Sequence, residues 1–154
     1  MLRGRDLHVK EQLSDQGLLK TQAFINGQWV DAKDGARLDI TNPATGEVIA
    51  SVAKVGAAET AEAIQAASEA MEKWRALPAK ARANILRDWF NIIMANQEDL
   101  ARIMTIEQGK VIAESRGEVA YGASYIEWFA EQAKRIDGDV IPGPSPDKRI
   151  VVSS

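Results

Sequence analysis

The hydrophobic and polar positions of this chain follow two different periods. Between residues 23 and 52, short apolar runs alternate with polar positions, which is typical of β-strands. The first two runs flank Asn26-Gly27, a dipeptide that favours the tight type I′ turn of a hairpin. Two later runs, 38–41 and 48–52, are separated by the turn-forming residues 42–46 and predict another pair of strands. The first third of the chain is therefore predicted to be β-rich.

From residue 57 onward the apolar positions recur every three or four residues, which predicts helices. We expect four: 57–76, a second whose first turn contains Pro78, 97–108 closed by Gly109, and a fourth from about Ile112 to Ile136. Small residues in the stripe of the fourth helix predict that it is sandwiched between other elements. That stripe contains Val119, Gly122, Ala123, Ile126, Phe129, Ala130 and Ala133. Trp29, Trp74 and Trp89 fall on apolar runs and are expected in the core.

The two ends of the chain carry weaker patterns. Residues 1–21 show neither period, and we expect them to form a loose lead-in. A proline- and glycine-rich loop over 138–146 precedes a short strand at Ile150–Val152, which has no partner after it. That strand is either an edge strand ending an ordinary domain or a strand cut from a longer protein. We favour the second interpretation.

The composition of the chain limits the class of protein to which it can belong. The 154 residues, of which 45% are hydrophobic, suffice for one ordinary domain. The net charge of −3 points neither to a nucleic-acid partner nor to a polybasic membrane anchor. No apolar run approaches the roughly 18 residues that a membrane span needs. The lead-in has acidic residues and no apolar stretch of the kind a signal peptide carries, so we expect a cytoplasmic protein.

The residues that usually carry chemistry are scarce. The sequence contains no cysteine, which excludes disulfides, thiolate metal sites and a cysteine nucleophile. Glycine-rich phosphate loops and the common zinc and serine-hydrolase motifs are also missing. The single histidine, His8, lies in the lead-in, which argues against a catalytic role. Considered residue by residue, the chain is an α/β protein that needs a partner.

A series of short motifs follows in a fixed order along residues 22–154: Phe24–Trp29, Asn42–Val48, Arg82–Leu86 and Glu107–Lys110. In this order and spacing they resemble the opening of an NAD(P)-dependent aldehyde dehydrogenase. Three further segments are similar to its succinate-semialdehyde branch, of which the glutarate-semialdehyde enzymes are close relatives: Trp74–Pro78, Tyr125–Glu131 and Gly138–Pro142. One departure is Val111, which stands where the family usually has proline.

The resemblance implies an α/β, aldehyde-dehydrogenase-like fold that is present only in part. The chain would contribute the N-terminal β-hairpin and strands, about four helices of the cofactor-binding domain, and the start of a bridging strand. We therefore divide it into a loose lead-in (1–21), an incomplete cofactor-binding domain (22–147) and the start of an oligomerisation strand (148–154). That strand would pair with residues outside the chain and link subunits into a homo-oligomer.

The resemblance also implies a function. The family oxidises a small aldehyde, here succinate semialdehyde or a similar semialdehyde, to the carboxylic acid with NAD or NADP. Its nucleophilic cysteine, its general-base glutamate and its cofactor loop all follow the position that matches Ser154. We therefore expect this chain to hold no catalytic or cofactor-binding residue, to bind no cofactor and to be inactive alone. The alternative is a truncated, non-catalytic protein that associates with full-length subunits.

Two site residues can be carried over from the family. Tyr121 matches a helix position that lines the substrate tunnel, although a half-buried helix tyrosine also serves in packing. Glu107 matches an acidic position that helps hold a structural monovalent cation, although a solvated carboxylate near a helix end is an equal alternative. No nucleic-acid or membrane partner is expected.

Overall fold

The structure is a computed structural model that describes residues 9–135, 138–142, 144–145 and 147–152, so His8 and Ser154 lie outside it. It is a mixed α/β chain, as expected, and contains three separate two-stranded antiparallel sheets and four α-helices among the described residues. In chain order the elements are η1 (Gln16–Leu18), β1 (Ala23–Ile25), β2 (Gln28–Val30), β3 (Arg37–Thr41), β4 (Val48–Ala53), α2 (Ala57–Ala76), α3 (Ala79–Ala95), α4 (Gln97–Gln108), α5 (Ile112–Gln132), β5 (Asp139–Pro142) and β6 (Arg149–Val152).

The predicted strands between residues 23 and 53 and the helices α2 and α4 are confirmed nearly to the residue, and α3 begins at Ala79, with Pro78 as its N-cap rather than in its first turn. Asn26 and Gly27 turn between β1 and β2 with φ values of 49° and 78°, the geometry that a type I′ turn requires. Gly109 ends α4 in the left-handed conformation with φ 71°. Val111 precedes α5 with φ −71°, an angle that proline also adopts, so the departure from the family's proline leaves this helix start unchanged.

The helix α5 ends earlier than expected. We predicted it to reach about Ile136, whereas the α-helix stops at Gln132. The backbone N–H groups of Lys134 and Arg135 donate three residues back, to Glu131 and Gln132, so the chain tightens into turns there. Periodicity does not detect this change because the apolar positions continue past it.

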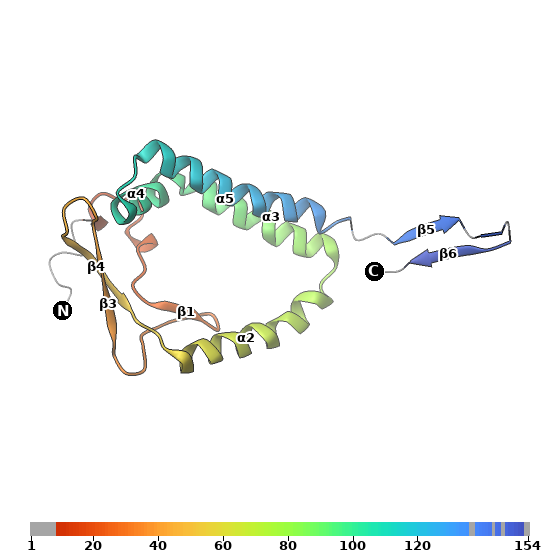
Figure 1. Cartoon of the computed structure of the whole chain (residues 1–154), viewed down its shortest axis with the longest axis horizontal. Coiled ribbons are helices and arrows are strands. Elements are labelled where there is room, and N and C mark those ends of the chain that lie inside the picture. The colour runs from red at the N-terminus through yellow and green to blue at the C-terminus, as the bar shows by residue number, and fades with distance from the viewer. Residues whose placement is uncertain (1–8, 136–137, 143, 146, 153–154) are drawn as a thin grey trace.

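The helices form a layer with one member apart from it (Figure 1). The long helices α3 and α5 lie side by side, and α4 packs against α5. In contrast, a turn at Leu77 and Pro78 separates α2 from α3, and the two helices point in different directions. The helix α2 contacts β1 instead. The predicted sandwiching of α5 is thus present on one side only, where Val119, Ala123 and Ala130 are buried.

The prediction that residues 1–21 form a loose lead-in is wrong from Val9 onward. Val9, Leu13 and Leu19 are buried and form a hydrophobic cluster with Ile49, against which Ile103 and other residues pack. The carboxylate of Asp99 also accepts hydrogen bonds from the backbone N–H groups in this segment. Apolar residues that lack a helical or strand period can still be buried when a segment is irregular, and this explains why the pattern missed them.

The C-terminal strand also differs from expectation. We predicted that β6 would find its partner outside the chain, yet β6 pairs with β5 in an antiparallel hairpin that projects from the helical layer (Figure 1). The proline and glycine content of 138–146 predicted a loop, but Pro142 takes the last position of β5, opposite Arg149. Proline is tolerated at such a strand end.

Much apolar surface is uncovered. Trp29 and Trp89, which we expected in the core, are 45% and 54% exposed, and only Trp74 is half-buried. Ile85 and Ile92, which share the side of α3 that carries Trp89, are about half exposed or more as well, so periodicity alone predicted the burial of Trp89 wrongly. Within the described residues, no helix has both the length and the apolar character needed to cross a membrane.

Candidate functional site

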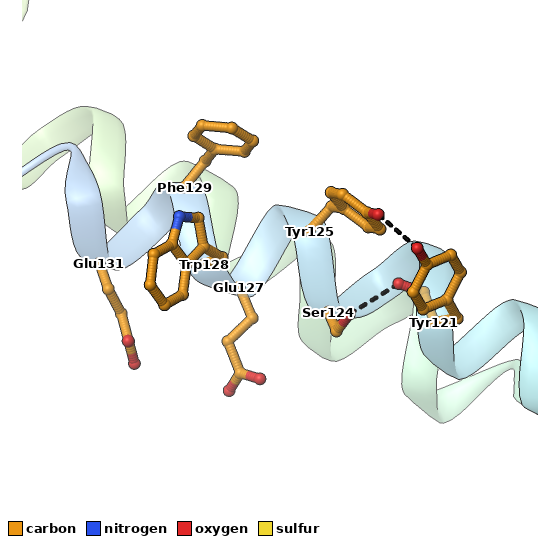
Figure 2. A pocket seen from close by; sticks show the side chains of 7 residues that line it. All are labelled: Tyr121, Ser124, Tyr125, Glu127, Trp128, Phe129 and Glu131. Atoms are coloured by element: carbon orange, nitrogen blue, oxygen red, sulfur yellow. Dashed lines mark hydrogen bonds between the residues drawn. The ribbon is translucent and has the colours of Figure 1, made fainter.

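An open hollow of about 710 Å³ runs along the outer side of α5 (Figure 2). All of its lining residues belong to this one helix: Tyr121, Ser124, Tyr125, Glu127, Trp128, Phe129 and Glu131. The aromatic members are exposed, and they recur at the spacing that places residues on one helix face. Tyr121, the residue predicted to line a substrate tunnel, thus lines this hollow.

Two tyrosines form the polar end of this hollow. The rings of Tyr121 and Tyr125 meet edge to face with centroids 5.1 Å apart, and their hydroxyl oxygens are 2.5 Å apart. The hydrogen bond to Tyr121, together with partial burial, raises the pKa of Tyr125 above its ordinary value. Next to them, the Ser124 hydroxyl donates to the backbone carbonyl of Tyr121 at 2.7 Å. The raised pKa favours the neutral form of the Tyr125 hydroxyl.

The other end of the hollow is acidic and fixed to the neighbouring helix. Arg87 of α3 donates to Glu127 at 2.6 Å and to Glu131 at 3.2 Å. These carboxylates, Glu127 first, raise the pKa of Arg87. One guanidinium faces two carboxylates, so this rim keeps a net negative charge. No lysine or arginine is among the described lining residues, and an anionic ligand would need its cation from elsewhere.

The hollow exists because α5 is apolar on two opposite sides. Val119, Ala123 and Ala130 are buried on the side of α5 that packs in the helical layer, while Tyr121 and Trp128 are exposed on the far side of the same helix. Sequence reasoning found the first stripe and missed Tyr125 and Trp128 as site residues. It wrongly placed Phe129 on the buried stripe, whereas Phe129 is 58% exposed and lines the hollow. The signal was present, since positions 121, 125 and 128 repeat at helical spacing opposite the predicted stripe.

Glu107, the second predicted site residue, is not part of this hollow. Glu107 lies at the end of α4, two residues before Gly109, and it is exposed. Neighbouring chain nevertheless removes enough solvent from the carboxyl to raise its pKa. Among the described residues, no three His, Cys, Asp or Glu side chains gather as metal ligands. A cation there would depend on backbone oxygens, and the cation role of Glu107 stays a prediction.

The lining of the hollow suits a small ligand. Aromatic rings and two hydroxyls suit a short carbon chain with a polar group. A nucleophilic cysteine is excluded by the composition, and the chain lacks a glycine-rich loop to hold a dinucleotide.

Comparison with known proteins gives consistent matches. The model of the aldehyde dehydrogenase family matches residues 29–154. Glutarate-semialdehyde dehydrogenase of Pseudomonas aeruginosa is 60% identical over 141 residues, which cover 92% of this chain and 29% of that protein. The NADP-dependent succinate-semialdehyde dehydrogenase of Escherichia coli is 57% identical over the same shares of the two chains.

The fold matches as well. The crystal structure of succinate-semialdehyde dehydrogenase from Burkholderia pseudomallei superposes with a TM-score of 0.84 at 53% sequence identity. The match covers 90% of this chain and 29% of the other. The chain therefore spans somewhat under a third of the length of the relatives that it matches.

Proposed function

The chain belongs to the aldehyde dehydrogenase family, and we propose that it supplies the N-terminal part of an enzyme that oxidises a short semialdehyde to the dicarboxylic acid with NAD or NADP. The observation that carries this proposal is the 60% identity to a glutarate-semialdehyde dehydrogenase across nearly the whole chain. The preference for succinate or glutarate semialdehyde is left open. The homo-oligomeric state that the resemblance implies and the cytoplasmic location expected from the lead-in belong to the same proposal.

The division of labour within the enzyme follows from the residues present. The chain holds no cysteine, so the nucleophile that attacks the aldehyde carbonyl must come from another part of the protein. The cofactor supplies the hydride acceptor when it is bound. We propose that the 154 residues alone turn over no semialdehyde, and that their contribution is structural and substrate-positioning.

For substrate positioning we propose the hollow of α5. Tyr121 is exposed there, beside the hydroxyl of Tyr125 and the rings of Trp128 and Phe129. A short aliphatic aldehyde would contact these rings, and one tyrosine hydroxyl would remain able to donate to an oxygen of the substrate. The distal carboxylate would need a cation from outside this lining.

A chimera tests the proposal. Residues 1–154 are joined to the segment of the Pseudomonas aeruginosa relative that follows the matched region, and reduced cofactor is measured with succinate and glutarate semialdehyde. We expect turnover by the chimera and none by the 154-residue chain. A chimera that folds and binds NADP but oxidises neither aldehyde contradicts the proposed function.

The role of Tyr121 is tested in the same chimera. Loss of one hydrogen bond of about 0.5–1.5 kcal/mol corresponds to a change of about 2- to 10-fold, so Tyr121→Phe should raise KM by that factor. Ala113→Ser, also exposed on α5 but outside the hollow, is the control and should leave KM unchanged. An unchanged KM for Tyr121→Phe would assign this tyrosine to packing alone.

A further inference from the structure

The turn between β1 and β2 consists of an asparagine followed by a glycine, and this pair has a chemistry of its own. Asparagine is one of the thermolabile residues of proteins. The backbone nitrogen of the next residue can attack the carbon of the side-chain amide, and a glycine in that position has no side chain to obstruct the attack. A Cβ built at Gly27 would meet nothing within 4 Å, so the turn lies in open space.

Both reacting groups of this turn are accessible. Asn26 and Gly27 are exposed. Within the described part of the chain, no hydrogen bond holds the side-chain amide of Asn26, and the backbone N–H of Gly27 donates to no acceptor. None of the other four asparagines of the sequence precedes a glycine; they precede Pro43, Ile85, Ile92 and Gln97. Position 26 is therefore the one asparagine whose neighbour leaves the attack unobstructed.

Asn26 already has a backbone angle that the attack requires. Its φ of 49°, together with the φ of 78° at Gly27, defines a type I′ turn. A type II′ turn keeps the positive φ at the first position and differs by a rotation of the central peptide, which moves ψ of the first residue from about +30° to about −120°. Gly27 accepts the accompanying change in the sign of its φ. The peptide between them can therefore flip while both strands stay in place.

The flipped turn brings the reacting atoms together. Cβ stands about 120° from the backbone nitrogen around the Cα–C bond, so a ψ of about −120° aligns Cβ of Asn26 with the nitrogen of Gly27. Cγ, which is bonded to Cβ, then lies within reach of that nitrogen by rotation of χ1 alone. In an unfolded chain, asparagine seldom has the positive φ that this hairpin holds permanently.

We propose that Asn26 is a site of self-modification, at which the folded hairpin permits closure of a succinimide ring. The nitrogen of Gly27 loses its proton to water and bonds to Cγ of Asn26. The bond from Cγ to the side-chain nitrogen breaks, and that nitrogen takes up a proton and leaves as ammonia. Water then opens the ring at either carbonyl and leaves an aspartyl or an isoaspartyl residue at position 26. The reaction consumes one water, releases one ammonia and needs no oxidant.

The isoaspartyl product changes the hairpin. Its peptide link runs through the side-chain carboxyl and adds one carbon to the main chain of a two-residue turn. That turn fixes the register in which Phe24 lies opposite Trp29, with ring centroids 5.1 Å apart. The longer main chain no longer matches this register. Because β1 also contacts α2, we expect the modification to loosen the hairpin from the helix.

Ageing of the purified 154-residue chain tests the proposal. The chain is held at physiological pH and temperature, with and without unfolding urea, and is then digested with trypsin and analysed by mass spectrometry. The peptide 21–33 contains Asn26 and no other asparagine, and the peptide 88–102 contains Asn91 and Asn96 as internal controls. We expect 21–33 to gain the mass difference between oxygen and NH, and 88–102 to keep its mass.

The comparison with urea shows whether the folded turn permits the reaction. Minor conformers of a protein are commonly populated at about 0.1–10%, and a type II′ population near the upper end should keep the rate in the folded chain within about tenfold of the rate in urea. Modification in urea without modification of the folded chain overturns the proposal, since the turn would then protect Asn26. An equal mass gain in 88–102 overturns it as well.

A variant separates the charge of the product from its backbone. Asn26→Asp carries the new carboxylate on an ordinary main chain, and aspartate is also favoured in this turn, so its Tm should match that of the fresh parent chain. The aged parent chain, enriched in the isoaspartyl form by ion exchange, should melt several degrees lower. An aged chain that melts together with Asn26→Asp would overturn the proposed loosening of the hairpin.

Discussion

The carboxylate of Asp99 accepts a hydrogen bond of 2.8 Å from the backbone N–H of Asp15, although 84 positions separate the two residues in sequence. The other carboxylate oxygen accepts from the N–H of Ser14 at 3.0 Å. Asp99 lies in the first turn of α4 and is buried, so one side chain joins the N-terminal segment to the helical layer.

Neutralising this carboxylate should destabilise the fold in a pH-dependent way. The two backbone N–H groups, that of Asp15 first, lower the pKa of Asp99. Its contribution is therefore complete above the ordinary pKa of about 3.9 and is lost as pH falls through the lower folded-state pKa. We expect Asp99→Asn to lower Tm by several degrees at pH 7 and to differ less from the parent chain as pH falls through the lowered pKa. Calorimetry at several pH values measures this, with Asp88→Asn, exposed on α3, as the control.

Leu13 tests whether the N-terminal segment belongs to the core. Its side chain is 6% exposed within the cluster of Val9, Leu19 and Ile49. Truncation of a buried leucine costs about 2–5 kcal/mol, so Leu13→Ala should lower the free energy of unfolding by that amount in a urea titration. Leu38→Ala removes the same atoms from a side chain that is half exposed and should cost much less. Equal effects of the two variants would mean that residues 9–19 are not packed as described.

Two glycine-to-alanine substitutions should have opposite signs. Gly109 has φ 71°, and an added Cβ would lie 2.7 Å from Cγ of Pro43, so Gly109→Ala should destabilise by about 1–3 kcal/mol. Gly117 lies inside α5, and a Cβ added there would meet nothing within 4 Å, so Gly117→Ala should stabilise by about 0.5–1 kcal/mol. Thermal unfolding of both variants checks the pair, and a stabilising Gly109→Ala would contradict the left-handed helix end.

The chain contains only two tyrosines, Tyr121 and Tyr125, so tyrosinate absorbance reports on this pair alone. The hydrogen bond between Tyr125 and Tyr121 raises the pKa of Tyr125, and alkaline titration should show a group ionising above the ordinary value of about 10. The raised pKa favours the neutral form of Tyr125. The hydrogen bond therefore contributes its full stabilisation below the ordinary pKa of about 10, and this contribution is lost as pH rises through the raised pKa. Tyr121→Phe should return the remaining transition toward 10. An unchanged transition would mean that the two hydroxyls are not bonded.

Local sequence determined the elements of this protein. Asn26-Gly27 specifies its hairpin turn because few other residues tolerate positive φ at both positions, and Gly109 ends α4 for a related reason. The helices α2 and α4 match the predicted ranges because their apolar period is uninterrupted between clear start and stop residues.

Tertiary structure decided the rest, because each remaining feature depends on residues that are distant in sequence. The burial of Leu13 and the bonds to Asp99 join segments that share no local pattern. The proline and glycine content of 138–146 predicted a loop, whereas β5 pairs with β6 in the structure. The hollow beside Tyr121 and the exposure of Trp89 depend on which helix faces find a neighbour. Periodicity shows that a face is apolar, and only packing determines what covers it.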